Sequence, residues 1–267
     1  MGQLSQLRIA VIARLKSHWR NILAIVLLAG VVAWIAGTAL ARTVPLPDRL
    51  QARDSKVITY RDGSAAHVFL SSDQKWRIHV DLTKVDTDYL EALIRFEDKR
   101  FWNHWGVDTL AISRAVFLNV TSGRRVSGAS TITMQLVRLL EPRPRTYTSK
   151  MIEALRAAQI ESRMTKREIL EAYLRFAPYG RNIEGIESAS MAYFGHRANN
   201  LSPDEIATLL AIPQAPNSRY PRPSNLVRLK QARDDIASRM LEENVIPRGE
   251  GAAKLDAKGV HEVIVNA

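Results

Sequence analysis

An uninterrupted apolar stretch near the N-terminus is the strongest constraint on how this chain can be arranged. Residues 22–41 (ILAIVLLAGVVAWIAGTALA) span 20 positions without a charged side chain, the length that an α-helix needs to cross the hydrocarbon core of a bilayer. No acidic residue precedes this stretch, and four basic ones do: Arg8, Arg14, Lys16 and Arg20. Because positive charge stays on the cytoplasmic side, we predict a cytoplasmic tail over 1–21, a transmembrane anchor over 22–41 and an exported remainder.

A cleaved signal peptide is the main alternative for this segment. Ala39, Leu40 and Ala41 resemble a small-residue cleavage site. The apolar stretch is longer than the usual core of a signal peptide, which favours an uncleaved anchor. A buried helix of a globular domain is disfavoured by the one-sided basic charge.

Charge and composition limit the classes of partner. The chain carries a net charge of +11 with a pI near 10.1. Residues 42–267 still hold 34 basic and 27 acidic residues, so an anionic partner is expected: nucleic acid, anionic lipid or a phosphorylated substrate. The chain has no cysteine, which excludes disulfides, thiolate metal sites and cysteine nucleophiles.

The exported part is predicted to be mainly α-helical after a small β element. Residues 42–82 form a linker and this β element, because KVITYRDGSAAHVFL has two β-like runs around an Asp62-Gly63 turn. KWRIHV (75–80) is a candidate third strand. A domain over 83–246 and a polar tail over 247–267 follow. Helical periodicity, capping boxes and proline stops predict helices near 88–99, 109–120, 131–140, 150–163, 166–176, 185–193, 203–212 and 225–241.

The stretch RFEDKRFWNHWG (95–106) gathers two acids, aromatic rings and an imidazole. Phe101 and His104 follow Glu97 at spacings of four and seven, on its side of a helix. Rings beside a carboxylate exclude water and raise its pKa, which suits a general base near neutral pH. The alternative is an amphipathic helix end with core aromatics and solvated charges.

Two further stretches carry polar side chains at helical spacing. In GASTITMQLVRLLEP, Thr131, Gln135 and Arg138 fall on one face, and a hydroxyl, an amide and a guanidinium suit a phosphate or sugar. The alternative is a helix cap followed by an exposed polar stripe.

In SKMIEALRAAQIESRM, cations flank a carboxylate every three residues: Lys150, Glu153 and Arg156. We expect Met151, Leu155 and Ile160 on the buried side of the same helix. The charged row is either a surface ladder of ion pairs, which contributes little stability, or a device opposite Glu97 that places a cation or metal on a pyrophosphate.

Together these stretches resemble the family 51 glycosyltransferases, the peptidoglycan glycosyltransferase domain of class A penicillin-binding proteins and their monofunctional relatives. The likeness runs from about residue 76 to 241 and is greatest to C-type members. The first motif, EDxxFxxHxG, is matched in full by Glu97, Asp98, Phe101, His104 and Gly106. Later motifs appear as GASTITMQLVR, SKMIE, KREILEAYLR and QARDDIASRM, the last keeping Arg233. They depart from the family at five positions: Met134, Arg138, Ser149, Arg175 and Ala232.

The resemblance implies a lysozyme-like, mainly helical fold with a membrane-associated jaw lobe. It also implies that lipid II is polymerised into β-1,4 glycan strands with inversion and release of undecaprenyl pyrophosphate. The catalytic domain would then be periplasmic, on a single-pass protein of the inner membrane. Lipid II, the growing strand, the membrane and other proteins of cell-wall synthesis are the expected partners; nucleic acid is not.

Roles for single residues also follow from the resemblance. Glu97 would be the base, and Glu153 would assist at the donor pyrophosphate, with a divalent cation (Mg²⁺ or Mn²⁺) as an optional ligand and no nucleotide cofactor. Asp98, Phe101 and His104 would shape the site. The remaining residues expected to bind substrate are Thr131, Gln135, Arg138, Lys150 and Arg233.

Two other functions remain open at this point: a weakened, membrane-anchored scaffold or binding protein, and a lytic enzyme of the lysozyme type. A transpeptidase domain is not expected, because Ser72-Asp-Gln-Lys75 fits the SxxK pattern but has no KTG partner. The chain is therefore expected to be monofunctional or a fragment of a longer protein.

Overall fold

The structure, a computed structural model, describes residues 43–61, 65–122, 130–243 and 245. It also describes five single positions before them: Ile25, Leu28, Val32, Gly37 and Ala39. The chain divides into two compact units, Met1–Pro45 and Leu46–Ala267. No helix within the described residues is long and apolar enough to span a bilayer. Most of the predicted anchor (22–41), and all of the tails predicted over 1–21 and 247–267, lie outside the described residues.

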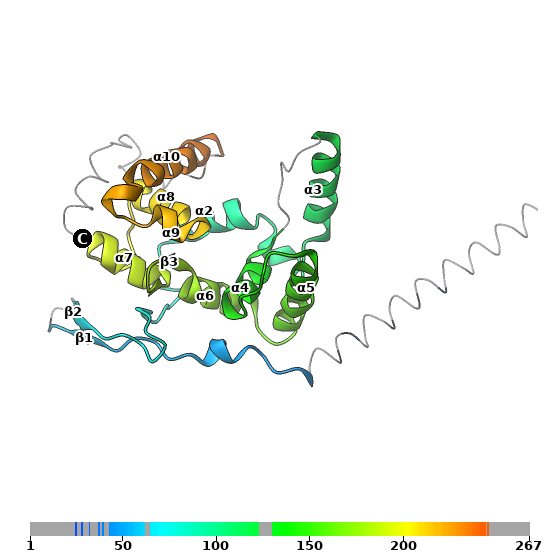
Figure 1. The fold of residues 1–267 in the computed structure, drawn as a ribbon, viewed down its shortest axis with the longest axis horizontal. Helices are drawn as coiled ribbons and strands as arrows, with labels where there is room; N and C mark the ends of the chain where they lie inside the picture. The colour runs from blue at the N-terminus through cyan, green and yellow to red at the C-terminus, as the bar shows by residue number, and fades with distance from the viewer. Residues whose placement is uncertain are drawn as a thin grey trace, which may run out of the picture. The chain divides into compact units, whose positions relative to one another are not determined.

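The second unit is mainly helical, as predicted (Figure 1). Its α-helices are α2 (Thr87–Glu97), α3 (Thr109–Ser122), α4 (Ile132–Leu140), α5 (Tyr147–Glu161), α6 (Lys166–Phe176), α7 (Ile186–Phe194), α8 (Pro203–Ala211), α9 (Pro216–Arg219) and α10 (Leu226–Glu242). Short 3-10 turns lie at Asp48–Gln51, Phe101–Asn103, Ile212–Gln214 and Pro223–Asn225. All eight predicted helices are present, and among the α-helices of the described residues only the four-residue α9 was not predicted.

Local capping explains most helix starts. The predicted capping boxes at Thr165/Glu168 and Ser202/Glu205 are both formed, so each cap satisfies two backbone N–H groups that the helix leaves open. Helix α5 begins three residues earlier than predicted because the Thr146 hydroxyl accepts the N–H of Ser149.

Two small antiparallel hairpins accompany the helices. The predicted one pairs β1 (Val57–Thr59) with β2 (Ala65–Val68), and its Asp62-Gly63 turn lies outside the described residues. The other pairs β3 (Pro178–Gly180) with β4 (Ile183–Glu184).

The predicted third strand at 75–80 is wrong. Trp76 makes a single bridge to Ile183, while the next two N–H groups donate to the hydroxyls of Ser55 and Ser188 at 3.0 and 2.8 Å. These backbone N–H groups thus donate to side-chain hydroxyls and not to the carbonyls of a neighbouring strand.

The core lies where α4 packs on α5 and α6, and where α8 packs on α10. Leu136 of α4, Leu174 of α6 and Leu209 of α8 are fully buried. On α5 the predicted buried side is partly wrong: Ile160 is buried, but Met151 and Leu155 are 69% and 71% exposed. The inner side of α5 carries smaller and polar residues instead: Ser149, Glu153, Ala157 and Gln159.

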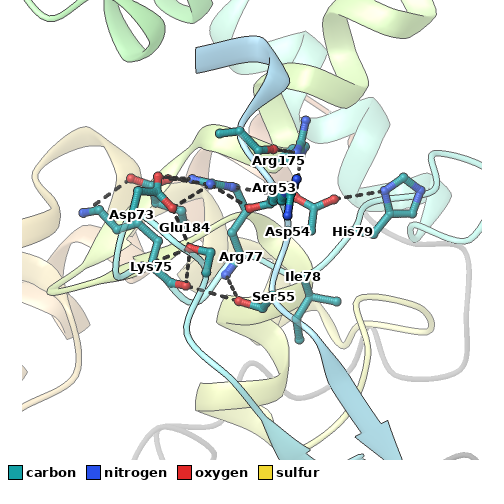
Figure 2. A network of polar contacts seen from close by, with 12 residues as sticks. Arg53, Asp54, Ser55, Asp73, Lys75, Arg77, Ile78, His79, Arg175 and Glu184 are labelled. Atoms are coloured by element: carbon teal, nitrogen blue, oxygen red, sulfur yellow. Dashed lines mark hydrogen bonds and ion pairs between the residues drawn. The ribbon is translucent and has the colours of Figure 1, made fainter. Parts of the chain in front are cut away.

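A buried arginine, Arg77, joins the segment before β1 and the turn after β2 to β4 (Figure 2). Arg77 is 0% exposed and donates to Glu184 at 2.7 Å and to Asp73 at 2.9 Å. Burial acts to raise the pKa of Asp73, but the hydrogen bonds from Arg77 and Ser71 outweigh it and lower that pKa to about 2. The guanidinium therefore faces an ionised carboxylate at Asp73.

Arg175, one of the departures from the family motif, belongs to the same network (Figure 2). Its Nε donates to Asp54 at 2.6 Å, and its other nitrogens donate to the carbonyls of Leu50 and Ala52. The arginine at the end of α6 thus binds the segment that leads from Pro45 into the second unit.

Candidate active site

Glu97 lies at the end of α2, half-buried. The helix is started by Asp86, whose carboxylate accepts the N–H groups of Asp88 and Tyr89, and is held in the core by Tyr89, Ala92 and Leu93. The side chain of Glu97 accepts a hydrogen bond from Gln135 Nε2 to Oε2 at 2.9 Å. The structure thus brings Glu97 together with the polar face of α4, 38 residues later in the chain.

Asp98 and His104 lie beneath this pair. The imidazole Nε2 is 3.0 and 2.9 Å from the two Asp98 carboxylate oxygens, and the same carboxylate accepts the N–H of Ile132 at 3.0 Å. Both side chains are about 4% exposed. Asp98 therefore ties the motif around Glu97 to the first turn of α4, with His104 fixing the carboxylate in place.

Phe101 and Thr131 also face inward. Phe101 is 0% exposed, with Lys166 Nζ 4.5 Å from its ring centroid. The Thr131 hydroxyl caps α4 by accepting the N–H of Met134 and donates to the Gly106 carbonyl at 2.6 Å. The predicted polar face of α4 therefore consists of Gln135 and Arg138, while Thr131 is 2% exposed and has its hydrogen bonds filled by the protein.

Gly106, whose carbonyl accepts the Thr131 hydroxyl, packs closely against α5. Its φ is +75°, and an added Cβ would lie 2.7 Å from the backbone carbon of Ala157. Both the left-handed conformation and the close approach to another backbone require glycine. The loop after His104 can therefore rest on α5 only if this residue has no side chain.

We expect Gly106→Ala to destabilise the protein by roughly 2–3 kcal/mol, the sum of backbone strain and overpacking. Gly195 is the matched control, because its φ is +79° but an added Cβ would meet nothing within 4 Å. Gly195→Ala carries only the strain and should cost about 1 kcal/mol. Denaturant unfolding measures both; equal losses would show that contact with α5 is not what demands glycine at 106.

Glu153 is the centre of a second group. Arg138 Nε donates to its Oε1 at 3.0 Å, and Lys150 Nζ donates to its Oε2 at 3.0 Å and to the Ser130 hydroxyl at 2.7 Å. The Glu153 side chain is 8% exposed, whereas Arg138 and Lys150 are 35% and 42% exposed. A buried carboxylate thus holds two cations whose outer sides face solvent, a local charge of +1 suited to an oxyanion ligand.

The donor chemistry around Glu153 does not fit a resident metal ion. Both carboxylate oxygens are engaged by cations, and no group of three or more metal-ligating side chains occurs among the residues that the structure describes. A divalent cation would need further oxygen ligands from a bound substrate.

Two predicted residues bind acidic side chains outside these groups. Arg233 on α10 is 4% exposed, and its hydrogen bonds go to the neighbouring Asp234. Arg156, the last cation of the predicted row on α5, binds Glu141, and this hydrogen bond lowers the pKa of Glu141. Neither of these hydrogen bonds joins the groups around Glu97 and Glu153, so the substrate contact predicted for Arg233 stays a prediction.

Two residues of the site were not singled out from the sequence. Ser130 precedes α4, and its hydroxyl accepts a hydrogen bond from Lys150 Nζ at 2.7 Å. Tyr173 has the spacing of an ordinary core residue on α6, yet its hydroxyl lies 3.5 Å from Gln135 Oε1. Periodicity gives no signal for such a contact, because it depends on how α4 and α6 pack.

Comparison with known proteins gives a consistent set of relatives. The family described as Transglycosylase matches residues 62–241. The chain is 39% identical over 234 residues to penicillin-binding protein 1C of Escherichia coli (strain K12), covering 86% of this chain and 29% of that protein. It is 40% identical over 171 residues to penicillin-binding protein 1A of Aquifex aeolicus (strain VF5), covering 64% and 23%.

A solved structure, that of penicillin-binding protein 1A from Haemophilus influenzae, is similar with 18% identity and a TM-score of 0.37, over 84% of this chain and 21% of that chain. The chain thus spans less than a third of the length of these relatives.

Proposed function

This chain belongs to the transglycosylase family, and on that premise we propose that it is a peptidoglycan glycosyltransferase that polymerises lipid II. The growing glycan is the donor and carries an undecaprenyl pyrophosphate leaving group. The 4-hydroxyl of the acceptor's GlcNAc attacks the donor's anomeric carbon with inversion. A β-1,4 bond forms, the bond from that carbon to the pyrophosphate oxygen breaks, and its electron pair leaves with the pyrophosphate.

The hydrogen bonding of the two Glu97 carboxylate oxygens is the observation that carries this proposal. One oxygen, Oε2, is held by Gln135, while Oε1 accepts no hydrogen bond from the described residues. A general base needs this combination: a fixed direction and an open lone pair. Glu97 is therefore proposed to take the proton of the attacking hydroxyl.

Arg138 and Lys150 are proposed to face the leaving pyrophosphate. Arg138 follows Gln135 by one turn of α4, and both cations have exposed outer sides beside the buried Glu153. Fixed positive groups at the place where negative charge develops lower the barrier without reorganisation. Glu153 holds these two cations in position.

We also propose that the protein is anchored by residues 22–41 in the inner membrane, with its N-terminus in the cytoplasm and the second unit, of lysozyme-like architecture, in the periplasm. Exposed apolar residues support a membrane-facing lobe around α3 and α5. They are Trp105, Leu110, Tyr147, Met151 and Leu155, each more than 60% exposed. Exposed apolar surface of this kind marks an interaction site, and its proposed partner here is the bilayer that holds the lipid-linked substrate.

The proposal is tested by incubating the purified full chain in detergent with labelled lipid II. Longer glycan chains are the expected product. Because Arg138 and Lys150 already engage Glu153, we expect polymerisation in EDTA to stay within a few-fold of that in Mg²⁺ or Mn²⁺. Strict loss in EDTA would show that a metal is needed. Shortened glycan from a preformed polymer would identify a lytic enzyme, and binding without polymer would identify a scaffold.

A further inference from the structure

Tyr173 contacts the glutamine that binds the proposed base and has no role in the function described so far. It projects from α6, is 5% exposed, and its hydroxyl donates to Gln135 Oε1 at 3.5 Å, long for an O–H···O bond. No other hydrogen bond of this hydroxyl occurs among the described residues. The contact therefore joins Tyr173 to the amide that binds Glu97.

Gln135 lies between an acceptor and a donor. Its Nε2 donates to Glu97 at 2.9 Å, and its Oε1 faces the Tyr173 hydroxyl. The two ends of a carboxamide have nearly the same shape, so the partners on each side decide which end points where. Three helices, α2, α4 and α6, contribute one side chain each to this row.

Tyr173 stays protonated over the range in which an enzyme works. Burial, followed by the negative charge of Glu97, raises the pKa of Tyr173 well above its usual value. A neutral phenol in contact with a carbonyl oxygen is a hydrogen-bond donor. The hydroxyl thus favours the amide orientation in which the NH₂ group points at Glu97.

The other charged or titratable groups around Glu97 are committed elsewhere. Asp98 pairs with His104, and Arg138 pairs with Glu153. Tyr89 of α2, whose pKa is raised by burial and to a lesser extent by Glu97, contacts the hydroxyl of Tyr179 at 3.2 Å. None of these groups contacts the Gln135 carbonyl, so they cannot set its orientation.

We propose that Tyr173 is a positioning residue, which holds the Gln135 amide with its NH₂ group toward Glu97. The proposal rests on the proposed function, since it gives Tyr173 its role through the base. With the amide held, Glu97 Oε2 is bound and Oε1 is left open for the substrate hydroxyl. If the amide turned over, its carbonyl would face the carboxylate and favour the protonated form, which cannot act as a base.

The test is Tyr173→Phe in the full chain, which removes one oxygen and keeps the ring. We expect the acidic limb of the kcat profile for lipid II polymerisation to move up by about 0.5–1 pH unit, the equivalent of one neutral hydrogen bond. At pH values below the acidic limb, kcat of Tyr173→Phe should be about three- to tenfold lower than kcat of the wild type, with KM unchanged.

Tyr193→Phe is the matched control. Tyr193 is also buried, and its hydroxyl donates to the Tyr179 carbonyl at 2.6 Å, without contact to Gln135. Tyr193→Phe should therefore leave the acidic limb of the kcat profile unchanged. In a Gln135→Met background, Tyr173→Phe should add no further shift, because the tyrosine acts through the amide.

A second readout separates this proposal from the proposed function. Proteins labelled with ¹³C at the glutamate carboxyls report the titration of Glu97 without any turnover. A midpoint at higher pH in Tyr173→Phe than in the wild type supports the positioning role even if no polymer forms. If the wild type polymerises lipid II, and Tyr173→Phe changes neither the titration midpoint of Glu97 nor the acidic limb of the kcat profile, the positioning role is overturned and the proposed function stands.

Discussion

Replacing Glu97 by glutamine should abolish lipid II polymerisation while leaving the fold intact. The amide keeps the size of the carboxylate but has no lone pair basic enough to take a proton from the attacking hydroxyl. Removing a general base typically lowers kcat by about 10²–10⁴-fold, and we expect the upper part of this range because no second carboxylate among the described residues binds the Gln135 amide. Quantification of polymer from labelled lipid II measures the effect.

Two controls make this result specific to the base. Glu91 lies on the same helix with an exposed side chain, so Glu91→Gln should polymerise at the wild-type rate. Thermal unfolding and lipid II binding of Glu97→Gln should stay close to wild type, since Glu97 makes one hydrogen bond at the edge of the core. Retained polymerisation in Glu97→Gln would remove Glu97 as the base, whereas lipid II binding without polymer in both the wild type and the variant would favour the scaffold.

The largest loss of stability is expected from Arg77→Met. Methionine keeps most of the apolar stem but leaves the carboxylates of Glu184 and Asp73 without the guanidinium between them. Removing one partner of a buried ion pair costs about 3–5 kcal/mol, because the remaining charge is left without compensation. The free energy of unfolding in urea, measured on the full chain in detergent, gives this value.

An exposed ion pair serves as the comparison for Arg77. Lys84 pairs with Asp81 at 3.0 Å, but its side chain is 73% exposed, and Lys84→Met should change stability by no more than about 0.5 kcal/mol. A loss below 1 kcal/mol for Arg77→Met would mean that Arg49 and Lys75, which also reach Glu184, replace the missing cation.

Features that depend on neighbours in sequence were predictable. The capping residues Thr165 and Ser202 act on N–H groups three residues away, and the spacing of apolar residues indicated where each helix lies. The β1–β2 hairpin followed from its turn residues for the same reason. The candidate base, Glu97, could be named because its acid and aromatic neighbours lie within one short stretch.

The direction in which side chains face depended on packing. Phe101, His104 and Thr131 have residue types that suit a substrate, but the structure places them inside. Met151 and Leu155 have types that suit a core, but they face outward. A helix such as α5 presents several faces, and the sequence does not state which one meets α4.

The sequence by itself therefore determined the helices, their caps and the chemical types gathered for the site. Only the tertiary structure decided that Glu97 meets Gln135, that Gln135 meets Tyr173, and that Arg77 meets Glu184. The physical reason is range. Caps and periodicity act between residues a few positions apart, whereas these contacts join residues 38 or more positions apart and exist only once the helices have packed.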